Sequence, residues 1–267
     1  MNSPDLPASL ACVAAGAADT LPPYARDWCY FLDVDGTLLD IAATPDAVRV
    51  DPALTKLLAA LRHAAGDAVA LISGRALSDL DRLFGAAAPI AAGQHGAERR
   101  DGVGRVHRHV GRRELLRTVV TRLAAFAARH PGVVFEDKGA SLALHVRGAP
   151  HAAGAARDAV AAGLRLLGGV YEMQVGKMVF EIKLTGYDKG SAIEDYMQEA
   201  PFTGRVPVFV GDDLTDEYGF CMVNALGGLS LKVGPGRSEA RHRLADAPAV
   251  RAWLAGWVDN ITATGNT

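Results

Sequence analysis

Short, continuously apolar runs alternate along this chain with segments of helical periodicity, and this alternation is the strongest constraint on its fold. Helical spacing of apolar residues covers 51–65, 76–84, 190–199 and 214–226. The apolar runs that we predict to be buried strands are residues 28–33, 68–73, 89–93, 206–210 and 229–233. Strands that are apolar on both faces are typical of a parallel sheet covered by helices on both sides. We therefore predict an α/β fold with a doubly wound, Rossmann-like parallel-sheet core domain.

The middle of the chain has a different pattern. After a predicted strand at 105–110, a helix, two strands, a helix and two further strands are expected at 114–129, 133–137, 142–147, 152–167, 171–174 and 179–183. This order is typical of a small antiparallel sheet with helices on one face. We predict an inserted α+β cap domain at 105–186, a core domain formed by 25–104 and 187–267, and a flexible N-terminal arm at 1–24.

Composition excludes several classes of partner. The 267-residue chain has a formal net charge of −2, which gives a nucleic acid or an acidic membrane no general attraction. No apolar run approaches the ~20 residues of a membrane span. The three cysteines are far apart and form neither a metal pattern nor an even disulfide set, which indicates a reducing compartment. We predict a cytoplasmic protein, with a monomer favoured, and interpret the arm as disordered because it lacks the basic start of a signal peptide.

Two carboxylates end the first predicted strand. Asp33 and Asp35 belong to the run DVDGT. Acidic residues after a strand are commonly turn formers or helix caps. Two facing carboxylates repel each other, however, so a site that keeps both ionised usually supplies a cation.

A second acidic cluster follows the predicted strand at 206–210. Its members in the run GDDLTDE include Asp212, Asp213 and Asp216. Parallel sheets place their sites at the carboxyl ends of the strands, so Asp212 is expected to meet the first pair there. Oxygen ligands of this kind suit Mg²⁺. Asp213 has the simpler alternative role of capping the helix that begins at residue 214.

Two further segments predict a phosphate site. Ser73 and Gly74 follow the second apolar strand, where a hydroxyl and free backbone N–H groups bind an anion well. Lys189 begins another predicted helix and could neutralise a phosphate, although a solvated lysine at a helix start is the simpler interpretation of that residue alone. With these groups in place, a carboxylate can attack phosphorus and a second can transfer the proton.

The four motifs DVDGT, SGR, DKG and GDDLTD resemble those of phosphohydrolases of the haloacid dehalogenase superfamily. The resemblance implies that Asp33 is the nucleophile and Asp35 the general acid/base. It implies that Asp33, the backbone carbonyl of Asp35, and Asp212 hold Mg²⁺, while Asp213 and Asp216 support this shell. The remaining implied roles are binding of the phosphoryl group by Ser73, Gly74 and Lys189, and substrate recognition by a cap inserted between the second and third motifs.

The runs LISGR, HGAERR, ALHVR, GKMVFEIK, QEAPF and PVFVGDDLTDEYGF are also similar to the bacterial trehalose-phosphatase family. That resemblance implies Mg²⁺-dependent hydrolysis of trehalose 6-phosphate through an aspartyl phosphate, in trehalose biosynthesis. The residues that it implies for sugar binding are His95, Glu136, Lys138, Arg147, Lys177 and Glu181. Two positions depart from the family pattern, Gln94 and Val146.

Alternatives remain at this stage. Each charged cap residue could be a solvated charge on a sheet, and His95 could line the hinge instead of contacting sugar. His145 could pack against the cap helices or face the substrate. The substrate could be another sugar phosphate. A signalling receiver shares the sheet, the aspartate and the lysine, but the acid at Asp35 and the large insert argue against it. An inactive sugar-binding module would have been indicated by the loss of a catalytic aspartate.

Overall fold

The computed structural model describes residues 21–42, 47–109, 111 and 113–264. The first 20 residues of the predicted arm lie outside this part of the chain. The last residues of the predicted arm are packed: Leu21 and Tyr24 contact the hydrophobic core, and the Tyr24 hydroxyl donates to the carbonyl oxygen of Trp253 at 3.2 Å. The folded core therefore begins before residue 25. Within the described residues, no helix is both long enough and apolar enough to cross a membrane.

An eight-stranded sheet forms the centre of the larger domain, with the order β12-β11-β10-β1-β2-β3-β4-β5. Strands β1 to β3 and β10 to β12 run parallel, and the pairs β3–β4 and β4–β5 are antiparallel. This arrangement confirms the predicted parallel-sheet core. The strands are β1 (Trp28–Leu32), β2 (Val69–Ile72), β3 (Ala91–Gly93), β4 (Glu98–Arg100), β5 (Val106–Arg108), β10 (Val206–Gly211), β11 (Leu229–Val233) and β12 (His242–Leu244).

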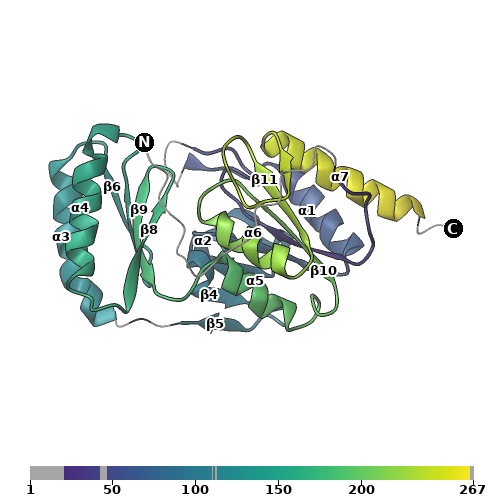
Figure 1. The fold of residues 1–267 in the computed structure, drawn as a ribbon, viewed down its shortest axis with the longest axis horizontal. Helices are drawn as coiled ribbons and strands as arrows, with labels where there is room; N and C mark the ends of the chain where they lie inside the picture. The colour runs from purple at the N-terminus through teal and green to yellow at the C-terminus, as the bar shows by residue number, and fades with distance from the viewer. Residues whose placement is uncertain (1–20, 43–46, 110, 112, 265–267) are drawn as a thin grey trace.

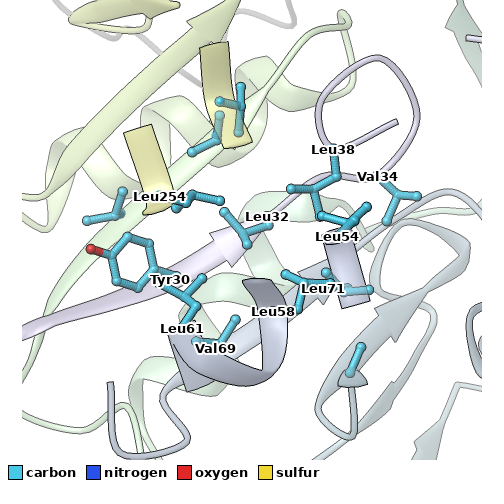
Figure 2. Packing of buried hydrophobic residues seen from close by; sticks show 14 of the residues in the cluster. Tyr30, Leu32, Val34, Leu38, Leu54, Leu58, Leu61, Val69, Leu71 and Leu254 are labelled. Atoms are coloured by element: carbon cyan, nitrogen blue, oxygen red, sulfur yellow. The ribbon is translucent and has the colours of Figure 1, made fainter. Parts of the chain in front are cut away.

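Helices cover both faces of this sheet (Figure 1). On one face lie α1 (Pro52–Ala64), α2 (Leu77–Phe84) and α7 (Ala247–Thr264), and on the other α5 (Lys189–Met197) and α6 (Asp216–Ala225). Alternate residues of β1 divide between the two layers: Tyr30 and Leu32 join the first, as Figure 2 shows, while Phe31 joins the second. A strand buried on both faces is what a continuously apolar sequence predicts.

Strand register brings the two acidic segments together. Strand β1 pairs with β10 so that Leu32 lies opposite Val210, and the backbone N–H of Asp33 donates to the carbonyl oxygen of Val210 at 3.0 Å. The segments that follow β1 and β10 then leave the sheet at the same edge. The predicted meeting of Asp33 and Asp212 follows from this pairing.

The middle of the chain forms a second sheet with its own core (Figure 1). Its order is β6-β7-β9-β8, and every neighbouring pair is antiparallel. Helices α3 (Arg113–Arg129) and α4 (Ala153–Leu164) pack on one face, which confirms the predicted α+β unit. Its strands are β6 (Val134–Asp137), β7 (Leu142–His145), β8 (Tyr171–Gly176) and β9 (Val179–Leu184).

Strand β5 differs from the prediction. It pairs with β4 in the large sheet, whereas the predicted boundary at residue 105 places it in the cap. A tight turn holds this hairpin, because one carboxylate oxygen of Asp101 accepts from the backbone N–H groups of Val103 and Arg105 at 3.0 and 2.9 Å. The chain therefore crosses to the second sheet after β5, close to the start of α3.

Leu32 anchors the strand that carries Asp33, and its side chain is fully buried. Leu32→Ala should lower the free energy of unfolding by about 2–5 kcal/mol, because it removes core contacts and leaves a cavity. Urea denaturation measures this change. Leu166→Ala, at a residue that is 47% exposed, is the matched control and should change stability by less than about 0.5 kcal/mol. Equal losses for the two variants would contradict the packing described here.

Candidate active site

A buried ammonium group joins the two acidic segments. Lys189 Nζ donates to Asp33 Oδ1 at 2.7 Å and to Asp216 Oδ1 at 2.6 Å. The other oxygen of Asp33 accepts from the hydroxyl of Thr37 at 3.2 Å. Lys189 is placed by the start of α5, where Asp188 caps the helix by accepting from the backbone N–H of Ser191. The alternative interpretation of Lys189 as a solvated lysine is thus excluded, since this side chain is buried among carboxylates.

Asp216 shapes the loop that carries Asp212. Its side chain is completely buried, and its Oδ2 accepts from the backbone N–H groups of Asp212 and Asp213, each at 2.8 Å. Gly211 is required at the end of β10, because a Cβ there would lie 2.3 Å from the Asp216 carboxyl carbon. Asp216 therefore fixes the backbone conformation of the loop that carries Asp212.

The acidic cluster fits a divalent cation. Carboxylate oxygens of Asp33, Asp212 and Asp216 lie within 4.8 Å of one another. Asp212 Oδ1 is buried and has no hydrogen-bond partner among the described residues. Gly36 has φ of +87°, and a Cβ there would lie 2.3 Å from the Asp212 carboxylate, so the DVDGT backbone closes tightly on this group. Asp216 accepts from Lys189 and two backbone amides, whereas within the described part of the chain Asp212 Oδ1 has no such partner and Asp33 Oδ2 accepts only from the Thr37 hydroxyl. Asp212 and Asp33 are therefore the better side-chain ligands.

Negative charge exceeds positive charge at this edge. Burial and the neighbouring Asp216 raise the pKa of Asp33 well above its usual value, although Lys189 opposes the shift. Burial, Asp216 and Asp213 raise the pKa of Asp212 to about 6. Burial would lower the pKa of Lys189, but Asp216 and Asp33 outweigh it and raise that pKa. Lys232 also approaches, since its Nζ donates to the carbonyl oxygen of Asp212. Two ammonium groups beside three carboxylates still leave a deficit that a cation such as Mg²⁺ would fill.

Asp35 is held away from this cluster by an arginine. Arg75 donates to both oxygens of Asp35 at 2.7 Å, as a bidentate pair. Burial tends to lower the pKa of Arg75, but hydrogen bonding to Asp35 raises it. The hydroxyl of Ser73 accepts from the backbone N–H of Arg75 at 3.1 Å, which folds the predicted phosphate loop next to Asp35. Both elements lie at the same edge of the sheet.

A cavity separates this edge from the second sheet, and every predicted sugar-binding residue lines it. From the cap side, Glu136 accepts from His145 Nε2 at 2.7 Å. Arg147 and Lys177 are exposed at its rim. Asp213 also reaches across to the cap, because its Oδ2 accepts from the backbone N–H of Lys177 at 3.1 Å.

Lys138 and Glu181 line the cavity and are already engaged, with each other and with groups of the core domain. Lys138 Nζ donates to the carbonyl oxygen of Gly74 and to Glu181 Oε1, both at 2.9 Å. His95 Nε2 lies 2.9 Å from the other oxygen of Glu181. Burial would raise the pKa of Glu181, but Lys138 and His95 hold it well below its usual range. Glu181 therefore takes part in this contact as an ionised carboxylate.

Several residues whose side chains contact the predicted site residues had no predicted role, among them Thr37, Arg75, Ser141, His145 and Lys232. Thr37 and Arg75 lie within the motifs DVDGT and SGR, so motif membership was a usable signal. The alternation of side chains along a strand placed His145 on one face. It did not decide whether that face packs against the helices or lines the cavity. Ser141 carried no signal, because its partners come from distant segments.

The parallel sheet, the acidic edge centred on Asp33 and the inserted α+β unit define an enzyme of the haloacid dehalogenase class, a phosphatase. Comparison with known sequences narrows this class. The family model for trehalose-phosphatase matches residues 31–248. The chain belongs to the trehalose-phosphatase family.

Individual relatives agree with this assignment. The trehalose-6-phosphate phosphatase of Escherichia coli (strain K12) is 43% identical over 233 residues, which are 87% of each chain. A probable trehalose-phosphate phosphatase of Sinorhizobium fredii is 42% identical over 252 residues, covering 94% of this chain and 95% of that protein. The crystal structure of a trehalose-6-phosphate phosphatase related protein matches with a TM-score of 0.73 at 26% identity, over 88% of this chain and 99% of that one.

The raised pKa of Asp212 predicts a pH dependence for the metal-free protein. Between pH 3.8, the ordinary pKa of an aspartate, and the folded-state pKa of about 6, the folded state binds more protons than the unfolded state, so stability falls as pH rises through this window. Asn at this position cannot ionise. The free energy of unfolding of Asp212→Asn, minus that of the unchanged protein, should therefore grow by about 2–3 kcal/mol from pH 4 to pH 7.

Urea unfolding in the presence of a chelator measures this difference at each pH. Excess Mg²⁺ at pH 7 should stabilise the unchanged protein more than the variant. A difference that stays constant from pH 4 to pH 7 would contradict the assigned electrostatics.

Proposed function

We propose that this protein is a Mg²⁺-dependent phosphatase that hydrolyses trehalose 6-phosphate to trehalose and phosphate, in trehalose biosynthesis, through an aspartyl phosphate. The observation that carries this proposal is the buried Lys189–Asp33 pair, which faces a cavity lined on its other side by charged residues of the second sheet. The family and the printed names of the relatives support the substrate.

Asp33 would act as the nucleophile. Its carboxylate attacks phosphorus, the bond between phosphorus and the sugar oxygen breaks, and an aspartyl phosphate forms. Lys189 keeps the carboxylate oriented and offsets charge on the phosphoryl oxygens. The hydroxyl of Ser73 and the backbone N–H of Gly74 are suited to bind those oxygens.

Asp35 would transfer the proton. It donates a proton to the departing sugar oxygen and later takes one from the water that attacks the aspartyl phosphate. Because Arg75 holds both carboxylate oxygens, at least one of these contacts must open before the proton can move.

The metal would be held by Asp33, Asp212 and the backbone carbonyl of Asp35, with Asp216 and Asp213 supporting their loop. When bound, Mg²⁺ supplies positive charge that stabilises the phosphoryl oxygens. The observations that support this set are the unpartnered oxygen of Asp212 and the close approach of Gly36.

The second sheet with its helices would act as a cap that reads the sugar. Glu136, Arg147 and Lys177 offer charged groups to the hydroxyls, and Lys138, Glu181 and His95 become available when their mutual contacts exchange for sugar. Recognition of a small polar ligand by a few fixed polar groups is typical of such clefts. We further propose that the protein acts in the cytoplasm as a monomer, as composition favours.

Substrate choice is tested by phosphate release. With Mg²⁺ present, kcat/KM for trehalose 6-phosphate should exceed that for glucose 6-phosphate by about 100-fold or more, because the second glucose unit adds several hydrogen bonds to the cap. A malachite-green assay on both substrates measures the ratio. Equal rates would defeat the substrate assignment and leave the phosphatase class intact.

Asp33→Asn tests the nucleophile. An amide cannot form the aspartyl phosphate, so kcat should fall by at least about 10⁴-fold. Thr121→Ala, an exposed change on α3, is the control and should keep full activity. Retention of more than about 1% of the activity by a folded Asp33→Asn protein would exclude the proposed covalent step.

A further inference from the structure

A buried serine of the cap lies between two acceptors, one from each domain. Ser141 Oγ is 3.0 Å from Gln94 Oε1 and 3.0 Å from Glu181 Oε1. The serine follows β6 in the turn toward β7, and it is 1% exposed. Gln94 belongs to the core domain, immediately after β3. This contact therefore crosses the boundary between the two sheets.

The orientation of the Gln94 amide is fixed by its other partner. Its Nε2 donates to Glu98 Oε1 at 3.1 Å, and a carboxylate can only accept. Glu98 is itself held, since the same oxygen accepts from the backbone N–H of Leu77 at 2.8 Å. The amide oxygen of Gln94 must then face Ser141.

The backbone also holds this residue in place. Gln94 has φ of +48° and His95 has φ of +58°, a left-handed conformation that favours glycine. Non-glycine residues in this region are strained and persist where surrounding contacts enforce them. The strained loop thus presents the Gln94 amide to the cap as a fixed group.

Ser141 has a single hydroxyl proton for two acceptors. Either oxygen can accept this proton at 3.0 Å. Glu181 is the charged acceptor and a charge-assisted bond is the stronger one, so we assign the proton to Glu181 when no sugar is bound. Ser141 is the sole donor that the described residues offer to Gln94 Oε1. With this assignment the Gln94 oxygen has no donor at the contact between the domains, which is unfavourable.

We propose that Ser141 and Gln94 are a positioning pair that couples sugar recognition by Glu181 to closure of the cap. This inference rests on the proposed function. A sugar hydroxyl that donates to Glu181 takes over the role of the serine there. The Ser141 proton then turns to Gln94 and completes a cap-to-core hydrogen bond only when the sugar is present.

Steady-state kinetics of Ser141→Ala, Gln94→Ala and the double variant test this proposal. Each single change should raise KM for trehalose 6-phosphate about five- to tenfold, with kcat changed less than about threefold, because one hydrogen bond is lost. The KM of the double variant should not exceed that of the more impaired single variant, since both changes break the same bond. Thr121→Ala is the matched control on the cap surface.

The ratio of kcat/KM for trehalose 6-phosphate to that for p-nitrophenyl phosphate separates positioning from general damage. A positioning role predicts that this ratio falls about five- to tenfold in both single variants, because the aryl phosphate has no sugar hydroxyl for Glu181. Damage to the fold would lower both activities together and leave the ratio constant. Gln94→Ala keeps the test decisive if the Ser141 variant does not fold.

A KM increase in the double variant equal to the product of the two single increases would overturn the proposal. Single variants whose KM lies within twofold of that of the unchanged protein would also overturn it. Failure of the proposed function looks different: the unchanged protein would then prefer another sugar phosphate over trehalose 6-phosphate. In that case the same three variants are assayed with the preferred sugar phosphate, and the same criteria apply to Ser141 and Gln94.

Discussion

The structure depends on one buried ammonium group, that of Lys189, held between Asp33 and Asp216. Isolated carboxylates are expensive to bury, and three of them converge where β1 and β10 leave the sheet. Lys189 compensates part of this charge and ties α5 to both acidic segments. The remaining deficit is the physical reason for proposing a metal ion here, and such an ion would help the site to bind a phosphoryl group.

The cap is joined to this edge by polar contacts as well as by apolar packing, in which Ala97 and Tyr187 of the core domain join the hydrophobic cluster of the cap. Lys138, Glu181 and Asp213 each bind a partner in the other domain. Such bonds can be exchanged one for one with sugar hydroxyls, whereas apolar packing could not. Lys138, Glu181 and His95, which are proposed to read the substrate, thus also hold the domains together without it, and this would make closing of the cap sensitive to the ligand.

Much of the fold could be predicted because β1, β2 and β10 are buried on both faces and therefore continuously apolar. The same logic placed Asp33 and Asp212 at one edge. Strands β4, β5 and β12 were missed or misplaced because, unlike the equally short β3, they are polar and only partly buried. Their pairing partners, not their own sequences, define them. The direction of the Asp35 side chain toward Arg75 depends on tertiary geometry, which residue spacing does not contain.

The most direct test is a crystal structure of the protein with Mg²⁺ and beryllium fluoride, a mimic of a phosphoryl group on a carboxylate. The account predicts beryllium bonded to a carboxylate oxygen of Asp33, its fluorides near Lys189 and Ser73, and Mg²⁺ bound by Asp33 and Asp212. Beryllium fluoride on a different side chain, or Mg²⁺ bound away from both aspartates, would contradict it.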